Sequence, residues 1–214
     1  MEKFIKTGNL KMYSEAFQDE FVDIVLKGQK QGYFVDVGGA CDDHKNGSNS
    51  LMFEERGWNG IIVDAESHRM VGRSCSSAAC WIGDGSGNTR KLGEVLKENN
   101  VPVLVDYLSI DIEGEDFKAV NSFVESGFTF KVATIEHNLY SRNPGDPEAT
   151  RLKSNIFNFL ASNGYVRIVD NAGNAANIKN LNSGWPFEDW YINPKYINYR
   201  ETIQRIKALQ EATL

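Results

Sequence analysis

The sequence predicts an α/β protein with a Rossmann-like, doubly wound sheet of mostly parallel strands. Short apolar runs typical of strands alternate with amphipathic segments typical of helices, which is the pattern of parallel strands joined by helical crossovers. An acidic residue stands at or just past the end of five successive predicted strands. The last two predicted strands have no helix between them, so one of them should run antiparallel to the rest.

Length and composition narrow the class of protein. A chain of 214 residues predicts a single domain, with a helical lead-in over about 1–31 and a C-terminal helix over about 199–212. The net charge of -6 and the lack of a basic run argue against nucleic acid as a partner. No apolar run approaches the ~20 residues of a membrane span, so we expect no membrane association. Three cysteines without C-x-x-C spacing favour a reducing, cytoplasmic setting over a zinc site.

The stretch from Tyr33 to Ala40 is the centre of the prediction. Tyr33 to Val37 is apolar with β-branched and aromatic members, which indicates a buried strand interrupted by Asp36. Gly38 and Gly39 then allow a sharp turn and leave room for a ligand against the backbone, although an ordinary strand-to-turn junction looks the same. The G-x-G-x-x-G pattern of dinucleotide sites is absent, and acids follow where a phosphate would bind. A cationic ligand without phosphate, such as S-adenosylmethionine, fits better.

The other elements follow in order. A helix is predicted from Ser14 to Lys27, with Ser14 as its cap, and a second from Asn49 to Arg56, ended by Gly57. The remaining helices are predicted at 90–98, 116–126 and 148–162, with a weakly amphipathic one at the C-terminus. The remaining strands are predicted at 61–63, 79–82, 107–111 and 132–136, with a closing hairpin of 165–169 and 189–192. Residues 65–78 are polar and give no assignment.

Acids at strand ends point to one site. The five are Asp36, Asp64, Asp84, Asp111 and Glu136. Because the carboxyl ends of parallel strands share one edge of a sheet, these side chains should line a single crevice.

Several sequence blocks together are typical of one protein family. They are Phe34-Val-Asp-Val-Gly-Gly-Ala40, Gly47-Ser-Asn-Ser50, the run from Phe53 to Asp64, Gly83-Asp-Gly-Ser-Gly87, Leu108-Ser-Ile-Asp-Ile-Glu-Gly114, Ile135-Glu-His-Asn138 and Asp189-Trp-Tyr191. Through these blocks the chain resembles the FkbM family of S-adenosylmethionine-dependent methyltransferases of class I over roughly residues 12–195. The resemblance implies a seven-stranded sheet in the order 3-2-1-4-5-7-6, with strand 7 antiparallel.

The resemblance also implies roles in binding the cofactor. Gly38 and Ala40 would let its amino-acid part approach the backbone, with Asp36 near the ammonium group. Ser48 and Asn49 would add hydrogen bonds. Asp64 would accept both ribose hydroxyls. Asp84 would accept the adenine amino hydrogen.

Catalysis needs an acceptor hydroxyl held near the methyl group and a group that takes its proton. The candidates are Asp111, Glu113, Glu136 and His137, and His137 has the ordinary pKa of a base near neutral pH. Asp111 and Glu136 could instead hold a hard divalent ion, Mg²⁺ or Mn²⁺. The expectation is an O-methyltransferase for a small hydroxylated acceptor such as a sugar or glycan. A lipid or polyketide hydroxyl as acceptor, and a non-catalytic cofactor-binding scaffold, are the alternatives.

Overall fold

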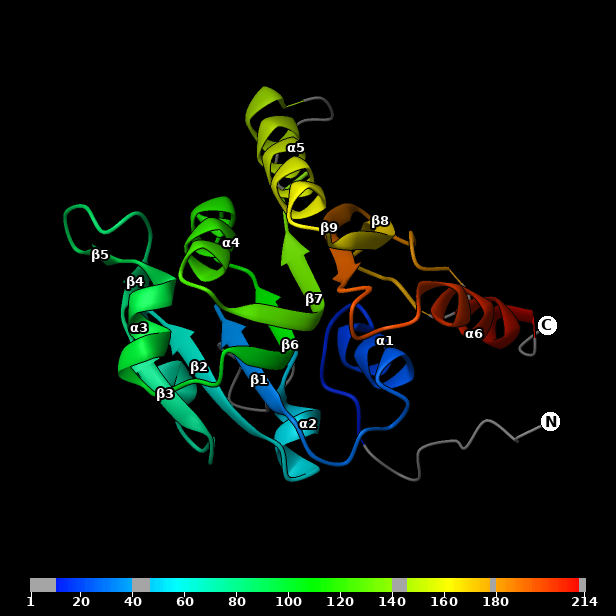
Figure 1. Ribbon diagram of the computed structural model, residues 1–214, viewed down its shortest axis with the longest axis horizontal. Helices are drawn as coiled ribbons and strands as arrows, with labels where there is room; N and C mark the ends of the chain where they lie inside the picture. The colour runs from blue at the N-terminus through cyan, green and yellow to red at the C-terminus, as the bar shows by residue number, and fades with distance from the viewer. Residues whose placement is uncertain (1–10, 40–46, 140–145, 178–179, 212–214) are drawn as a thin grey trace.

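A seven-stranded sheet forms the centre of the protein in a computed structural model, described here over residues 11–39, 47–139, 146–177 and 180–211 (Figure 1). Its order is β3-β2-β1-β6-β7-β9-β8, and β9 runs antiparallel to both of its neighbours. The strands are β1 (Tyr33–Val37), β2 (Asn59–Asp64), β3 (Ser76–Ala79), β6 (Leu104–Ile110), β7 (Thr129–Glu136), β8 (Val166–Gly173) and β9 (Pro186–Ile192). Numbered along the chain, this is the order 3-2-1-4-5-7-6 with an antiparallel strand 7, so the predicted fold class is confirmed.

The third strand corrects the sequence prediction. It lies at Ser76–Ala79, whereas the second half of the predicted segment 79–82 forms β4 (Trp81–Ile82). β4 pairs with β5 (Thr89–Arg90) in a separate two-stranded sheet. β3 consists of small, mostly exposed residues at the edge of the main sheet, so it lacks the apolar and β-branched side chains by which a strand is predicted from sequence. Backbone pairing with β2 is what places it there.

Helices cover both faces of the sheet. One face carries α3 (Leu92–Glu98), α4 (Asp116–Glu125) and α5 (Pro147–Ser162), and the other carries α1 (Gln18–Val25), α2 (Leu51–Glu55) and α6 (Tyr199–Glu211). A short 3-10 helix, η1 (Ser67–Met70), follows β2. Alternation along β1 shows the two layers, because Val35 packs into the α3–α5 side and Phe34 into the α1–α2 side. None of the described helices has the length and apolar character to cross a membrane.

The first helix begins later than predicted. Ser14 does not cap it by the usual N-terminal bond, and the helix starts at Gln18. Asp19 instead folds the preceding residues into a loop by accepting the backbone N–H of Tyr13 at 2.7 Å and the hydroxyl of Ser14 at 2.5 Å. Phe17 is held in the left-handed region at φ 73°. This loop is next to the cleft described below.

Candidate functional site

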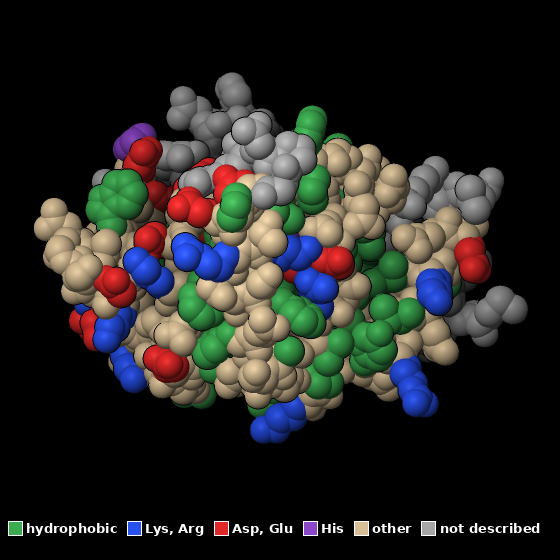
Figure 2. Space-filling view, turned by 90° about the horizontal axis from the view of Figure 1, so that it is seen from above, with side chains coloured by type: hydrophobic (Ala, Val, Ile, Leu, Met, Phe, Trp, Pro, Cys, Tyr) green, Lys and Arg blue, Asp and Glu red, His purple; other side chains and the backbone are tan. Residues whose placement is uncertain are grey.

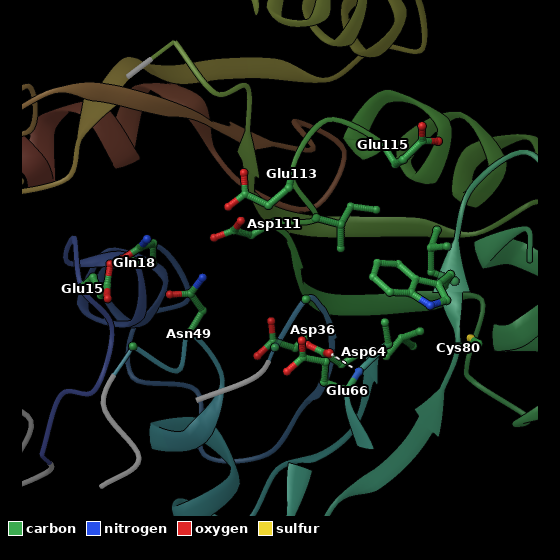
Figure 3. Close-up of a pocket in the computed structure, with 18 of the residues that line it drawn as sticks. Glu15, Gln18, Asp36, Asn49, Asp64, Glu66, Cys80, Asp111, Glu113 and Glu115 are labelled. Carbon is green, nitrogen blue, oxygen red and sulfur yellow. Dashed lines mark hydrogen bonds between the residues drawn. The ribbon is translucent and has the colours of Figure 1, made fainter. Parts of the chain in front are cut away.

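A cleft of about 710 Å³ opens where β1, β2 and β6 end (Figure 3). Because these strands are parallel, their ends lie along one edge, as the sequence predicts for an open α/β sheet. Seven carboxylates line the cleft: Glu15, Asp36, Asp64, Glu66, Asp111, Glu113 and Glu115. None of the described residues that line it is Lys, Arg or His. Figure 2 looks onto this edge and shows several acidic side chains grouped there. Such a wall attracts cations and repels phosphates.

The floor of the cleft is the turn after β1. Gly38 has φ +78°, and a Cβ on it would come within 1.7 Å of the carbonyl oxygen of Asp111. A Cβ on Gly39 would come within 2.5 Å of the Asp36 carboxyl carbon. The glycine pair is therefore required for packing, as well as leaving backbone accessible to a ligand.

Asp36 lies under this turn in a buried polar network. Its carboxylate accepts the Ser50 hydroxyl at 2.5 Å, and Ser50 in turn accepts from Arg73 at 2.9 Å. Burial raises the pKa of Asp36, and the Ser50 hydrogen bond and the Arg73 charge partly oppose that rise. Arg73 also donates to Glu54 at 2.7 Å, so it connects α2 to the segment before β3. Sequence reasoning missed Arg73, because it lies in the stretch 65–78 that has no periodicity.

The loop before α1 supplies a second wall that the sequence did not predict. Glu15 and Gln18 both line the cleft beside Asn49 (Figure 3). The backbone N–H of Gly47 donates to the Tyr13 carbonyl at 2.7 Å, which brings this loop to the segment carrying Asn49. In the sequence, the polar residues around Phe17 could have indicated this loop, but the segment was predicted to be helical.

The far end of the cleft lies beyond β2. Asp64 is half-buried there, and its Oδ1 accepts the backbone N–H of Glu66 at 2.7 Å, which fixes the carboxylate at the wall. Cys80, Trp81 and Ile82 form an apolar end with one large exposed aromatic ring, since Trp81 is 65% exposed.

Two of the predicted cofactor residues, Asp84 and Ser48, are not among the described residues that line the cleft. Asp84 is exposed in the loop after β4, where it accepts from Ser86 at 2.6 Å and lies 3.4 Å from the Lys118 ammonium. Ser48 is buried behind the wall, where its hydroxyl accepts from the Leu51 backbone at 3.1 Å. Ala40 lies outside the described residues.

Asp111, Glu113 and Glu136 form a group of acids. One carboxylate oxygen from each lies within 4.8 Å of the others. Register explains the group, because Ile110 pairs with Ile135 and so places Asp111 beside Glu136 just past it. Burial and the neighbouring charge of Asp111 raise the pKa of Glu136, so the two carboxyl groups hold a proton between them. Of the three, Asp111 and Glu113 line the cleft.

Two buried side chains hold this group in place. Asp116 accepts the backbone N–H groups of Ile112 at 3.0 Å and Gly114 at 2.8 Å, which fixes the turn that carries Glu113 at φ +58°. With its amide nitrogen facing Glu136, Asn138 donates to that carboxyl at 3.0 Å and accepts from Gly114 at 3.2 Å. A left-handed backbone at a residue other than glycine is costly, so the turn is a feature that the surroundings maintain.

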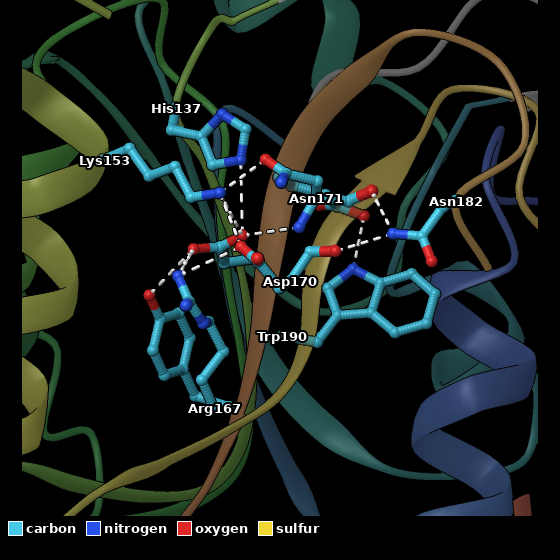
Figure 4. Close-up of polar contacts among 10 residues, drawn as sticks. His137, Lys153, Arg167, Asp170, Asn171, Asn182 and Trp190 are labelled. Carbon is cyan, nitrogen blue, oxygen red and sulfur yellow. Dashed lines mark hydrogen bonds and ion pairs between the residues drawn. The ribbon is translucent and has the colours of Figure 1, made fainter. Parts of the chain in front are cut away.

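The His137 side chain lies on the face of the sheet opposite to that of Glu136. Side chains alternate along a strand, so the residue after Glu136 points away from it. His137 is 1% exposed, and its Nε2 is 3.4 Å from Asp189 Oδ1 (Figure 4). Arg167 binds the same carboxylate at 2.8 Å, and Lys153 lies 3.5 Å from it. Burial alone would raise the pKa of Asp189, but His137 and the nearby cations hold it well below its usual range. His137 is not among the described residues that line the cleft.

Comparison with known proteins finds a similar solved structure and no matching family. No family model matches the chain, and no curated protein matches it. A solved structure described as cofactor-bound Rv0187 from MTB is similar to it, with 7% identity over 88% of this chain and 84% of that chain and a TM-score of 0.47.

Proposed function

We propose that this protein is an S-adenosylmethionine-dependent methyltransferase of the class I type, as its resemblance to the FkbM family implies. The observation that carries the proposal is the charge of the cleft, which has seven carboxylates and no cation among its described lining residues. S-adenosylmethionine has a sulfonium and an ammonium group and no phosphate, so it fits where a nicotinamide or flavin dinucleotide would be repelled. The topology supports the proposal, because the cleft stands at the carboxyl edge of the strands.

The two ends of the cleft fit the two ends of this cofactor. Asp64 at the end of β2 is positioned to accept ribose hydroxyls, and the apolar end with Trp81 offers a surface on which adenine can stack. Gly38 and Gly39 line the cleft, so their backbone faces the space proposed for the amino-acid part. Adenine recognition in this proposal uses the β4 segment, and Asp84 contributes only if its exposed loop moves.

The reaction that we propose is O-methylation of a small hydroxylated acceptor, a sugar or glycan. Asp111 lines the cleft beside Glu136, its hydrogen-bonded partner, and burial raises the pKa of Asp111. Asp111 is therefore positioned to take the acceptor proton, with Glu113 beside it. His137 stays a candidate base from the sequence, but its place beside Asp189 favours a structural role. A lipid or polyketide hydroxyl is the alternative acceptor.

The same acids fit a divalent ion. Oxygen ligands of an octahedral Mg²⁺ lie roughly 3 to 4 Å apart, so small side-chain rotations would bring Asp111, Glu113 and Glu136 into range. We propose Mg²⁺ or Mn²⁺ as a second cofactor, which would replace the shared proton of the acid pair. Its chemistry there would be to lower the pKa of a bound hydroxyl.

A non-catalytic scaffold is the alternative from another class. Calorimetry with S-adenosylhomocysteine first tests cofactor binding, which a methyltransferase requires and a scaffold unrelated to the cofactor lacks. Tritiated-methyl transfer over a panel of monosaccharides, glycans and hydroxylated lipids then tests catalysis. Binding without transfer to any class on the panel would favour the cofactor-binding scaffold, and no binding would refute the proposal.

We also propose a cytoplasmic location. Cys75 and Cys80 are free thiols, which is the usual state in a reducing compartment. Cys41 lies outside the described residues. Thiol labelling of protein taken directly from its source tests this, and a disulfide there would contradict it.

A further inference from the structure

A buried hydrogen-bond acceptor in the wall of the cleft has no donor in the part of the chain that the structure describes. Asn49 is 9% exposed, and its Nδ2 donates to the Ser109 hydroxyl at 3.1 Å. Its Oδ1 is fully buried and has no hydrogen-bond partner among the described residues. An unsatisfied buried carbonyl is destabilising, so we expect a ligand that donates to it.

Glu15 lies on the same side of the cleft as this carbonyl (Figure 3). A Cβ on Gly47 would be 3.5 Å from Glu15 Oε1, which shows how near the carboxylate is to the segment leading to Asn49. A carboxylate and an unpaired carbonyl oxygen together accept hydrogen bonds from a cation that carries several N–H donors.

Asp36 is less suited to this cation. It is 1% exposed, it already accepts the Ser50 hydroxyl, and it packs under Gly39. The sequence placed the cofactor ammonium next to Asp36. In the structure, Glu15 and Asn49 also line the cleft, and the Asn49 Oδ1 has no partner among the described residues that a cation would have to displace.

We infer that Glu15 and the Oδ1 of Asn49 form a binding site for an ammonium group. The inference rests on the proposed function, because the α-ammonium of the cofactor is one source of that group. An amino group on the acceptor is the other. Both sources share the same chemistry, a primary ammonium that donates to one carboxylate and one carbonyl.

The test compares two ligands that differ only in the amine. Calorimetry measures S-adenosylhomocysteine and its analogue lacking the α-amino group against the wild type, Glu15→Gln and Asn49→Ala. If the ammonium belongs to the cofactor, each substitution weakens S-adenosylhomocysteine about 10-fold and changes the deaminated analogue by less than about 2-fold. Asn49→Asp retains an acceptor at this position and should bind S-adenosylhomocysteine at least as well as the wild type.

Glu66→Gln is the matched control for general charge. Glu66 is an exposed carboxylate that lines the same cleft near Asp64, so its loss should change the affinity for both ligands equally. If Glu15→Gln also changes the affinity for both ligands equally, Glu15 acts only through the overall negative charge of the cleft. That result would overturn a specific site for the ammonium group of the cofactor.

A second arm tests the acceptor as the source. With S-adenosylhomocysteine bound, glucosamine and glucose are titrated and followed by ligand-observed NMR. A preference for glucosamine in the wild type that Glu15→Gln abolishes, with unchanged S-adenosylhomocysteine affinity, assigns the ammonium to the acceptor. Equal binding of the two sugars, together with no selective effect in the first arm, overturns the inference.

The proposed function and this inference fail in different ways. A wild type that binds neither S-adenosylhomocysteine nor its analogue refutes the function, and the comparison of glucosamine with glucose without nucleoside then decides the ammonium site. A wild type that binds both nucleosides equally, with no sugar preference, keeps the function and refutes the site.

Discussion

Gly38 packs so closely against Asp111 that a Cβ on Gly38 would come within 1.7 Å of the Asp111 carbonyl oxygen. The contact joins the end of β1, the floor of the cleft, to the end of β6, which carries the acid group. The backbone N–H of Asp111 donates to the carbonyl of Val37 at 2.9 Å and fixes the same junction. The positions of the cofactor turn and of the candidate base are therefore set together.

We predict that Gly38→Ala destabilises the protein and abolishes cofactor binding. The new methyl group would meet backbone that has no side-chain freedom to move, in addition to the strain of φ +78°. Gly57→Ala is the control, because Gly57 has φ +97° and open space where a Cβ would be. Urea unfolding should show a loss at least ~2 kcal/mol larger for Gly38→Ala. Equal losses of stability in the two variants would mean that the positive φ of Gly38, and not its contact with Asp111, explains the effect.

We predict that Asp64→Ala weakens S-adenosylhomocysteine binding by ~2 kcal/mol, about 30-fold, because it removes a charge-assisted pair of hydrogen bonds to the ribose. Asp84→Ala should change the affinity by less than about 2-fold, since Asp84 is exposed and outside the described lining. Calorimetry measures both variants. Unchanged affinity for Asp64→Ala would remove Asp64 from the site, and a large loss for Asp84→Ala would restore the role that the sequence predicts.

The acid group predicts dependence on a divalent ion. A chelator should abolish methyl transfer, and Mg²⁺ or Mn²⁺ should restore it. Asp111→Asn should lower turnover by about 10²–10³ with S-adenosylhomocysteine affinity retained, and should weaken Mn²⁺ binding measured by calorimetry. Glu115→Gln serves as a control outside the group of three. Activity that resists the chelator but is lost in Asp111→Asn would leave Asp111 acting as a base alone.

His137→Ala separates the two roles of that residue. A general base would lose turnover by ~10²–10⁴ on substitution. Because His137 faces Asp189 on the opposite side of the sheet from Asp111, we expect turnover to stay within about 3-fold and stability to fall by ~1–3 kcal/mol. Single-turnover kinetics and urea unfolding measure the two effects. A large loss of turnover in a fully stable variant would establish His137 as the base.

We predict that the protein loses stability at acidic pH because Glu54 becomes protonated. Burial would raise its pKa, but hydrogen bonds from Ser74 and the charge and hydrogen bond of Arg73 lower it to about 2 from the usual 4.5. A lowered folded-state pKa contributes stability above pH ~4.5 that is lost as the pH falls toward ~2. The contribution is about 2 kcal/mol once screening by nearby solvent is allowed for. Urea unfolding between pH 2 and pH 6 should show a smaller pH dependence in Glu54→Gln, and an identical dependence would contradict this assignment.

The sequence by itself determined the sheet and most of the acids at its edge. Alternation of strands and helices fixes parallel pairing, and the acids at the ends of β1, β2 and β6 reach one cleft because parallel strands end together. Period-two alternation was also in the sequence, and it places Glu136 and His137 on opposite faces.

Only the tertiary structure decided which other residues join the site. Arg73 comes from a segment without periodicity, and its place depends on a hydrogen bond to Ser50. Glu15 comes from a segment predicted to be helical, and its place depends on the loop that the Tyr13–Gly47 hydrogen bond holds. The edge strand β3 is fixed by backbone hydrogen bonds to β2 rather than by its small side chains. Asp84 is part of a Gly-rich turn that local hydrogen bonds with Ser86 direct toward solvent. The pattern of apolar and polar side chains shows which residues of one helix or strand are buried. The positions of Arg73, Glu15, β3 and Asp84 depend instead on contacts between segments far apart in the sequence, which that pattern does not show.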